Sequence, residues 1–238
     1  MDRVLGLIPA KSGSRRVARK NLRPLGGKSL LEWAIRGALA ATCLDRLVVS
    51  TEDRETAEMA RAAGADVPFM RPAHLAQDPH GVVDVCLHAL DALETAGDRF
   101  DHLVILLPSS PFRRARHVVE ALEQYRRQGT GFLMSVSRLD TALLSAHVVR
   151  DGRMEPLLPE WIGRLGARAH KSKLPELVKS NGAVTIVDVA RFRAEKNYYV
   201  YPLAAYEMPW PEGLDVDTED DMLLAEALVN AGRARLGQ

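Results

Sequence analysis

A basic stretch near the start of the chain has the composition of an anion-binding loop. It reads IPAKSGSRRVARKN at residues 8–21, lacks acidic residues, and carries five cationic ones, namely Lys11, Arg15, Arg16, Arg19 and Lys20. Ser12, Gly13 and Ser14 are small enough for backbone N–H groups to approach an anion, while the cations supply charge and forked donors. These residue types favour phosphate as the ligand; the alternative is a solvated loop without a ligand.

An acidic stretch further along, LDVDTEDD at residues 214–221, has the pattern of a site for a divalent cation. In an extended segment residues i and i+2 face the same side, so Asp215 and Asp217 converge on one point. Mg²⁺ relieves the repulsion between two carboxylates and keeps waters that leave room for a phosphate ligand. Acid enrichment at a helix N-terminus is the alternative; it accounts well for residues 219–221 and poorly for Asp215. We therefore predict that Asp215 and Asp217 bind Mg²⁺.

Two common phosphate-binding motifs are absent from the basic stretch. Gly27, Lys28 and Ser29 match the end of the Walker A pattern, but Leu22 stands where its first glycine is required. The pattern G-x-G-x-x-G is also missing from the first turn. The sequence therefore supports neither a P-loop kinase nor a dinucleotide-binding dehydrogenase.

Length, charge and hydropathy narrow the class of protein. A chain of 238 residues is long enough for one large domain, or for one domain with an insertion. The net charge is only +1, so the basic stretch is a local feature and no nucleic-acid partner is expected. The first residues lack the long apolar segment of a signal peptide, and no apolar run approaches the roughly 20 residues of a membrane span. We expect a soluble cytoplasmic protein without a membrane partner.

Short apolar runs alternate with helical patterns along most of the chain. The apolar runs are typical of buried strands and lie at residues 4–8, 47–50, 103–107, 132–136 and 183–187. Amphipathic patterns predict helices at residues 30–41, 54–63, 82–95, 115–128 and 218–231. Buried strands separated by helices indicate an α/β fold of three layers, with a mainly parallel sheet covered on both faces.

The alternation breaks at residues 137–180, which contain three prolines, several glycines and many cations but no clear strand–helix unit. We predict an inserted lobe there, within an α/β domain formed by residues 1–136 and 181–238. Ligands of an open parallel sheet collect beyond the carboxyl ends of its strands. The basic stretch, PSSPFRR after the third apolar run and LDVDTEDD should therefore meet at one edge of the sheet.

Six motifs occur in a characteristic order: IPAKSGSRRVARKNL, GKSLLEWAI, RPAHLAQD, LPSSPFR, SNGAVTI and LDVDTEDD. In this order they resemble the acylneuraminate cytidylyltransferase family, the CMP-sialic acid synthetases and relatives that activate other eight- and nine-carbon 2-keto acid sugars. The resemblance covers nearly the whole chain. It implies a Rossmann-like fold of the nucleotide-diphospho-sugar transferase type. It also implies a nucleotidyltransferase that converts CTP and a sialic-acid-like nonulosonate to CMP-sugar and pyrophosphate, with Mg²⁺.

The resemblance also implies roles for residues of the nucleotide site. The residues that match the family's triphosphate-binding loop are Lys11, Ser12, Arg15 and Lys20. Asn21 matches a residue that contacts the nucleotide, Arg71 matches the arginine that meets the cytosine, and Asp78 closes the same motif. Asp215 and Asp217 match the metal-binding aspartates, and with Lys20 they are the expected catalytic residues.

On the sugar side the resemblance implies a site lined by Leu107, Ser109 and Asn181. The family's inserted lobe reaches into the active site of a partner subunit. The resemblance thus implies a homodimer, in which Lys171 and Lys179 serve the partner's site. Sialate enzymes usually carry glutamine at the position of Leu107 and arginine at those of the two lysines. The acceptor alternatives are therefore a KDO-like, pseudaminic-like or legionaminic-like acid or a phosphonate; a further alternative is a non-catalytic nucleotide-binding homologue.

Overall fold

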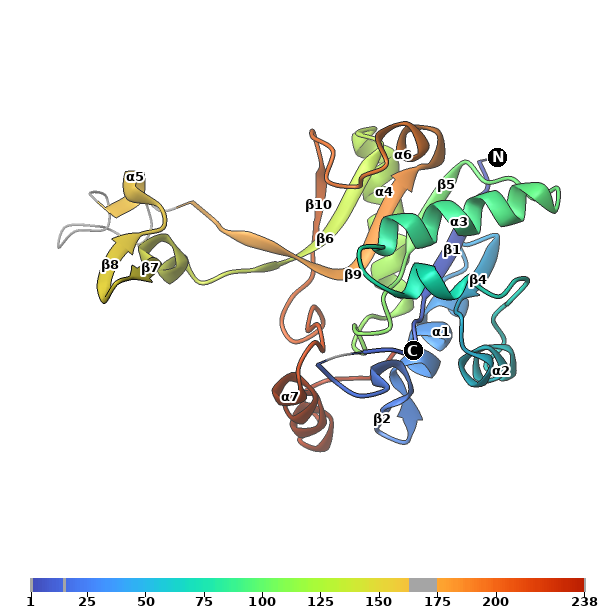
Figure 1. Cartoon of the computed structure of the whole chain (residues 1–238), viewed down its shortest axis with the longest axis horizontal. Helices are drawn as coiled ribbons and strands as arrows, with labels where there is room; N and C mark the ends of the chain where they lie inside the picture. The colour runs from blue at the N-terminus through green and yellow to red at the C-terminus, as the bar shows by residue number, and fades with distance from the viewer. Residues whose placement is uncertain (1, 15, 163–174, 238) are drawn as a thin grey trace. The chain divides into compact units, whose positions relative to one another are not determined.

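The computed structural model describes residues 2–14, 16–162 and 175–237, which form two compact units (Figure 1). The larger unit consists of Met1–Val136 and Asn181–Gln238, and the smaller unit is Ser137–Ser180. The larger unit holds the six-stranded sheet and the helices that pack on it.

The sheet has the strand order β10-β6-β9-β5-β1-β4. Its strands are β1 (Val4–Pro9), β4 (Arg46–Ser50), β5 (His102–Ile105), β6 (Phe132–Arg138), β9 (Val178–Asp188) and β10 (Ala204–Glu207). β1 runs parallel to β4 and β5, and β10 runs parallel to β6, whereas β9 is antiparallel to β5. The predicted mainly parallel α/β sheet is confirmed, and β10 is a strand that the apolar pattern did not indicate.

Helices cover both faces of the sheet, as the packing of successive β1 residues shows. Val4 and Ile8 of this strand belong to one apolar cluster, which also includes residues of α1 (Leu30–Leu39), α2 (Arg54–Ala62) and α4 (Ala115–Gln128). Leu5 and Leu7 belong to a second cluster, with residues of α3 (Val82–Thr95) and α6 (Val189–Glu195). Because successive strand residues face opposite sides, the two clusters lie on opposite faces and the unit has three layers.

The last helix begins where its capping residues predict. Helix α7 (Glu219–Asn230) follows Thr218, whose side chain accepts a hydrogen bond from the Asp221 N–H at 3.2 Å. The Asp221 carboxylate in turn accepts from the Thr218 N–H at 2.8 Å, which completes a capping box. Val216 packs in a small cluster with Met222 of this helix, so the acidic stretch is anchored directly before it.

Shorter elements connect the main ones. In the larger unit these are η1 (Lys20–Leu22), β2 (Pro24–Leu25), β3 (Lys28–Ser29) and η2 (Ala73–Ala76). The smaller unit contains η3 (Thr141–Ser145), β7 (His147–Arg150), β8 (Arg153–Pro156) and α5 (Pro159–Ile162). β7 and β8 are antiparallel and joined by Asp151 and Gly152, both with positive φ, the conformation that two-residue hairpins favour. Residues 137–180, where the sequence has no clear strand–helix unit, therefore contain a β-hairpin.

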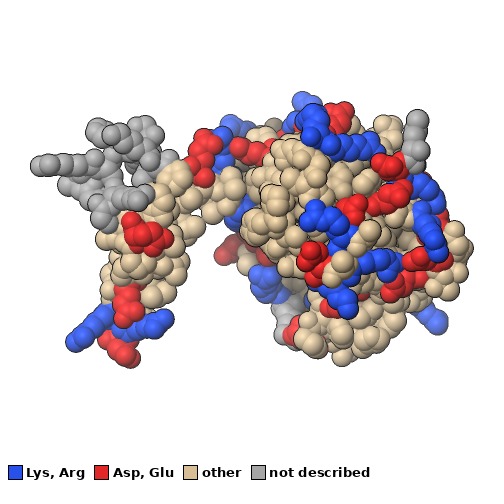
Figure 2. Space-filling view, turned by 90° about the horizontal axis from the view of Figure 1, so that it is seen from above, with Lys and Arg blue, Asp and Glu red and all other residues tan. Residues whose placement is uncertain are grey.

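Charged side chains of both signs lie close together on the face of the larger unit in Figure 2. Such mixing agrees with a net charge of +1 and gives the drawn face no broad region of one sign. Within the part of the chain that the structure describes, every helix is too short or too polar to cross a bilayer.

Candidate active site

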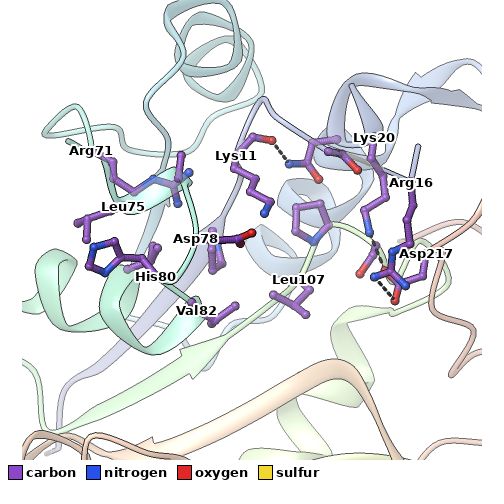
Figure 3. Close-up of a pocket in the computed structure, with 18 of the residues that line it drawn as sticks. Lys11, Arg16, Lys20, Arg71, Leu75, Asp78, His80, Val82, Leu107 and Asp217 are labelled. Atoms are coloured by element: carbon purple, nitrogen blue, oxygen red, sulfur yellow. Dashed lines mark hydrogen bonds and ion pairs between the residues drawn. The ribbon is translucent and has the colours of Figure 1, made fainter. Parts of the chain in front are cut away.

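A cleft of about 460 Å³ opens at the carboxyl ends of β1 and β5 in the larger unit. Its lining includes Pro9 at the end of β1, Leu107 and Ser109 after β5, and the aspartates that precede α7. Figure 3 shows Arg71 at one end of this cleft and Asp217 at the other. The cleft therefore lies at the carboxyl ends of the parallel strands, where the sequence analysis places the ligand site.

Most of the predicted site residues line this cleft. They are Lys11, Lys20, Asn21, Arg71, Asp78, Leu107, Ser109, Asp215 and Asp217. Ser12 and Asn181 are described but are not among the lining residues, and Lys179 is an exposed residue of the smaller unit. Arg15 and Lys171 lie outside the described residues. The structure thus brings together both aspartates assigned to the metal and most of the residues assigned to the nucleotide.

Asp217 is held by two cations of the basic stretch. Lys20 Nζ lies 2.9 Å from Asp217 Oδ1 and also donates to the Val216 carbonyl at 2.9 Å. Arg16 Nη2 lies 3.1 Å from Asp217 Oδ2, so both carboxylate oxygens face a cation. Burial opposes ionisation of Asp217, but the Lys20 hydrogen bond and the charges of Lys20 and Arg16 keep its pKa below the usual value. Sequence reasoning left Arg16 without a partner, whereas the structure places it in the cleft.

Asp215 has the opposite electrostatic environment. Burial and the nearby charge of Asp217 raise its pKa, and a hydrogen bond from Ser109 opposes this only in part. Its Oδ1 atom is buried and has no hydrogen-bond partner among the described residues. A buried oxygen without a donor, next to a second carboxylate, is the environment that a bound cation would relieve. The residues present therefore fit a hard divalent cation.

The backbone explains why the two aspartates share a side. Val216 between them is fully buried, and its N–H donates to the Ser109 carbonyl at 2.8 Å. With the middle residue turned into the core, its neighbours both turn toward the cleft, which both of them line. Asp215 and Asp217 thus face the same cleft, as their spacing in the sequence predicts.

Asn21 shapes the basic stretch from inside. The side chain is buried, and Nδ2 donates to the Lys11 carbonyl at 2.8 Å. This bond joins the two ends of the stretch, so that Lys11 and Lys20 both reach the cleft. Asn21 therefore organises the loop in addition to lining the cleft.

Glu52 is a residue of this region that sequence reasoning missed. It accepts hydrogen bonds from Ser12 and from Arg71, and so joins two predicted nucleotide-binding segments. Both the N–H and the hydroxyl of Ser12 are committed to this carboxylate. One feature of the sequence does point to Glu52, namely its position directly after the second apolar run. This position lies at the same edge of the sheet as the basic stretch.

One side of the cleft is apolar. Its lining includes Leu75, Val82, Val85 and Leu107, of which Val82 and Leu107 are drawn between the two ends in Figure 3. Leu107 packs against Gly182, which has φ +70°, and a Cβ added there would lie 3.0 Å from Leu107 Cδ1. Gly182 therefore lets Leu107 pack directly against the backbone of β9, and a larger residue at this position would collide with the leucine.

A cluster of basic residues fixes the segment that leads to the aspartates. Glu212 accepts hydrogen bonds from Arg114 and Arg116, and its Oε2 lies 2.9 Å from His117 Nε2. Burial opposes ionisation of Glu212, but the hydrogen bonds from Arg116 and His117 hold its pKa below the usual 4.5. The cluster therefore secures the chain three residues before Asp215.

We expect Glu212→Gln to lower the free energy of unfolding at pH 7 by about 1–3 kcal/mol, because it removes one partner of a partly buried charge cluster. The carboxylate's contribution is complete above its unfolded pKa of 4.5 and is lost as pH falls through the lower folded value. The difference in the free energy of unfolding between Glu212→Gln and the wild type should thus become smaller below pH 4.5. Urea unfolding of both proteins at pH 7 and at pH 3.5 measures this difference and its dependence on pH. The exposed Glu123→Gln is the control, and an equal effect from it would contradict the role of Glu212.

Comparisons with known proteins agree with this geometry. A family model described as cytidylyltransferase matches residues 5–151. The CMP-N,N'-diacetyllegionaminic acid synthase of Legionella pneumophila is 29% identical over 98% of this chain and 99% of its own. The pseudaminic acid cytidylyltransferase of Campylobacter jejuni is 25% identical, over 94% and 95%.

A solved structure has the same fold. It is described as CMP:2-keto-3-deoxy-manno-octonic acid synthetase complexed with CTP, and it covers 97% of this chain and 99% of its own. The TM-score is 0.70 at 18% sequence identity. This match extends beyond residues 5–151, which the family model covers.

Proposed function

Because the chain belongs to the cytidylyltransferase family, we propose that it transfers CMP from CTP to an acidic 2-keto sugar and releases pyrophosphate. The acceptor in this proposal is a sialic-acid-like nonulosonate. The observation that carries it is the meeting of the cations Lys11 and Lys20 with Asp215 and Asp217 in one cleft. Cations suit a triphosphate, and the acidic pair suits the metal that accompanies it.

In the proposed reaction the anomeric hydroxyl oxygen of the sugar forms a bond to the α-phosphorus of CTP. The bond from that phosphorus to the oxygen that bridges the α- and β-phosphorus atoms breaks, this oxygen leaves with the pyrophosphate, and the hydroxyl proton passes to a base. Alignment and charge neutralisation dominate such transfers. Lys11, Arg16 and Lys20 line the cleft where they can balance the charge of the departing pyrophosphate. The two aspartates that line the cleft, Asp215 and Asp217, are the candidates for the base.

Asp215 and Asp217 are the residues that would hold Mg²⁺ in this proposal. The Oδ1 atom of Asp215, which is buried and has no hydrogen-bond partner within the described part of the chain, supports that assignment. When bound, Mg²⁺ supplies positive charge at the phosphate oxygens and lowers the pKa of a coordinated hydroxyl. With only two carboxylates from the chain, the remaining coordination positions are available to water and to phosphate oxygens.

The apolar side of the cleft bears on the choice of acceptor. A sugar hydroxyl placed against Leu107 and Val82 would lose hydrogen bonds to water without finding a partner. Such a surface favours acceptors that present methyl or methylene groups there. Legionaminic-like and pseudaminic-like acids therefore stand beside sialic acid as substrates to test, with KDO-like acids and phosphonates as further alternatives.

A homodimer is part of the same proposal. The smaller unit exposes several large apolar side chains, namely Leu143, Val149, Met154, Leu157 and Val178. Contact with a second copy would remove this apolar surface from water. Lys179 would then serve the partner's acidic substrate, and the family resemblance assigns the same role to Lys171. We place the reaction in the cytoplasm, where CTP is available.

Pyrophosphate release from CTP tests the proposed function. The acceptor panel contains N-acetylneuraminate, a diacetyllegionaminate, a pseudaminate, 2-keto-3-deoxy-manno-octonate and a phosphonate, and mass spectrometry identifies the CMP product. We expect one responsive nonulosonate and a loss of the rate when EDTA removes Mg²⁺. Release with a KDO-like acid or a phosphonate alone supports the alternative acceptors. CTP binding without release for any acceptor supports a non-catalytic homologue.

A further inference from the structure

Glu52 lies just after β4 and connects two segments of the cleft region that are separate in the sequence. Its Oε1 atom accepts hydrogen bonds from the Ser12 N–H at 2.8 Å and from Ser12 Oγ at 2.9 Å. Its Oε2 atom accepts from Arg71 Nη2. One carboxylate thus holds both the basic stretch and the arginine at the far end of the cleft.

The pair of Glu52 and Arg71 is almost removed from water. The side chains are 12% and 2% exposed, respectively. Burial opposes ionisation of Glu52, but the Ser12 N–H and Arg71 keep its pKa below the usual value, so the carboxylate is charged at neutral pH. The Arg71 N–H also donates to the Thr51 carbonyl at 2.9 Å, which ties its backbone to the end of β4. Arg71 is therefore held in one position before any ligand binds.

Arg71 is paired one to one with a carboxylate, whereas Lys20 and Arg16 share the single carboxylate of Asp217. With Glu52 beside Arg71, the pair carries no net charge, and the carboxylate repels an approaching anion. Arg71 Nε is nevertheless buried without a hydrogen-bond partner among the described residues. A donor in a neutral pair suits an uncharged acceptor, such as the carbonyl of a pyrimidine base, better than a phosphate.

We propose that Glu52 is a positioning residue that holds Arg71 for an uncharged pyrimidine carbonyl and ties the basic stretch to that base site. The inference rests on the proposed use of CTP. It divides the cleft into a neutral end that reads the base and a cationic end, with Lys11 and Lys20, that takes the phosphates.

Glu52→Gln tests this assignment, because the amide keeps a carbonyl for Ser12 but turns an NH₂ group toward the Nη2 donor of Arg71. We expect the Kd of CMP, measured by calorimetry, to rise about 10-fold, while that of pyrophosphate changes less than about 3-fold. In the assay, KM for CTP should rise by a similar factor and kcat should stay within about 3-fold. A general loss of structure would weaken both ligands, so the ratio of the two effects is diagnostic.

Glu55→Gln is the matched control, since Glu55 is exposed and pairs with Arg19, which is not among the residues lining the cleft. It should leave both ligands unaffected. If Glu52→Gln does not fold, Glu52→Asp, whose shorter side chain cannot reach both partners, should show the same selective loss. Unchanged CMP binding, or equal weakening of CMP and pyrophosphate binding, overturns the role of Glu52 but leaves the proposed function standing. A wild-type protein that does not bind CMP overturns the proposed function and this inference with it.

Discussion

Asp217→Asn should lower kcat/KM for CMP-sugar formation by about 10³-fold or more, since it removes an anionic ligand from the proposed metal site. Asp217 faces Lys20 at 2.9 Å and Arg16 at 3.1 Å, and its lowered pKa keeps it ionised at neutral pH. An amide can neutralise neither cation, and its uncharged oxygen binds a hard divalent ion more weakly than a carboxylate does. Pyrophosphate release with CTP and the responsive sugar measures the loss.

The fold should survive this change, because the Asp217 side chain is 37% exposed and its ion pairs are partly in solvent. The matched control is Asp220→Asn, an exposed acid in the first turn of α7 that is not among the residues lining the cleft. It should keep activity within about 2-fold, as expected for an exposed surface change. Near wild-type turnover of Asp217→Asn, with the fold intact, would remove this residue from the catalytic site.

Lys20→Gln should lower kcat/KM by about 10²–10³-fold, the usual effect of removing a preorganised charge from a phosphoryl-transfer site. Lys20 Nζ bonds both the Val216 carbonyl and Asp217 Oδ1, each at 2.9 Å, and its side chain is only 17% exposed. The substitution thus removes a cation from the cleft and loosens the backbone between the two aspartates. The same pyrophosphate assay, run at saturating and at low CTP, separates the effects on kcat and KM.

Arg19→Gln is the control for Lys20, because it removes the same charge from the neighbouring position. Arg19 pairs with Glu55, and both side chains are more than 60% exposed. We expect less than about 2-fold loss of activity from this exposed pair. An equal loss from both variants would mean that the total charge of the basic stretch matters, and not the contacts of Lys20.

Local sequence patterns predicted the main elements of the larger unit well. Periodicity depends on neighbouring residues, so the helix at 82–95 and the helix at 115–128 agree with α3 and α4 to the residue. The capping pair of Thr218 and Asp221 likewise marked the start of α7. In the smaller unit, however, the apolar pattern does not predict β7 and β8, because each strand is only four residues long and largely exposed and so has no buried apolar run.

Contacts between distant segments were not predictable in the same way. The order of the strands decides which loops meet, and the sequence does not state that β4 lies beside β1. Only this neighbour relation brings Glu52 to Ser12. For the same reason Arg16, one of several similar arginines, could not be matched with Asp217 before the fold was known.

The sequence by itself determined the α/β class, the cytidylyltransferase resemblance and the two charged stretches, because each depends on residue type and on spacing along the chain. Only the tertiary structure decided which charges pair and which remain available. It commits Ser12 to Glu52 and leaves Asp215 Oδ1 buried without a partner among the described residues. Burial and the distance between charged atoms set those outcomes, and both are properties of the folded chain alone.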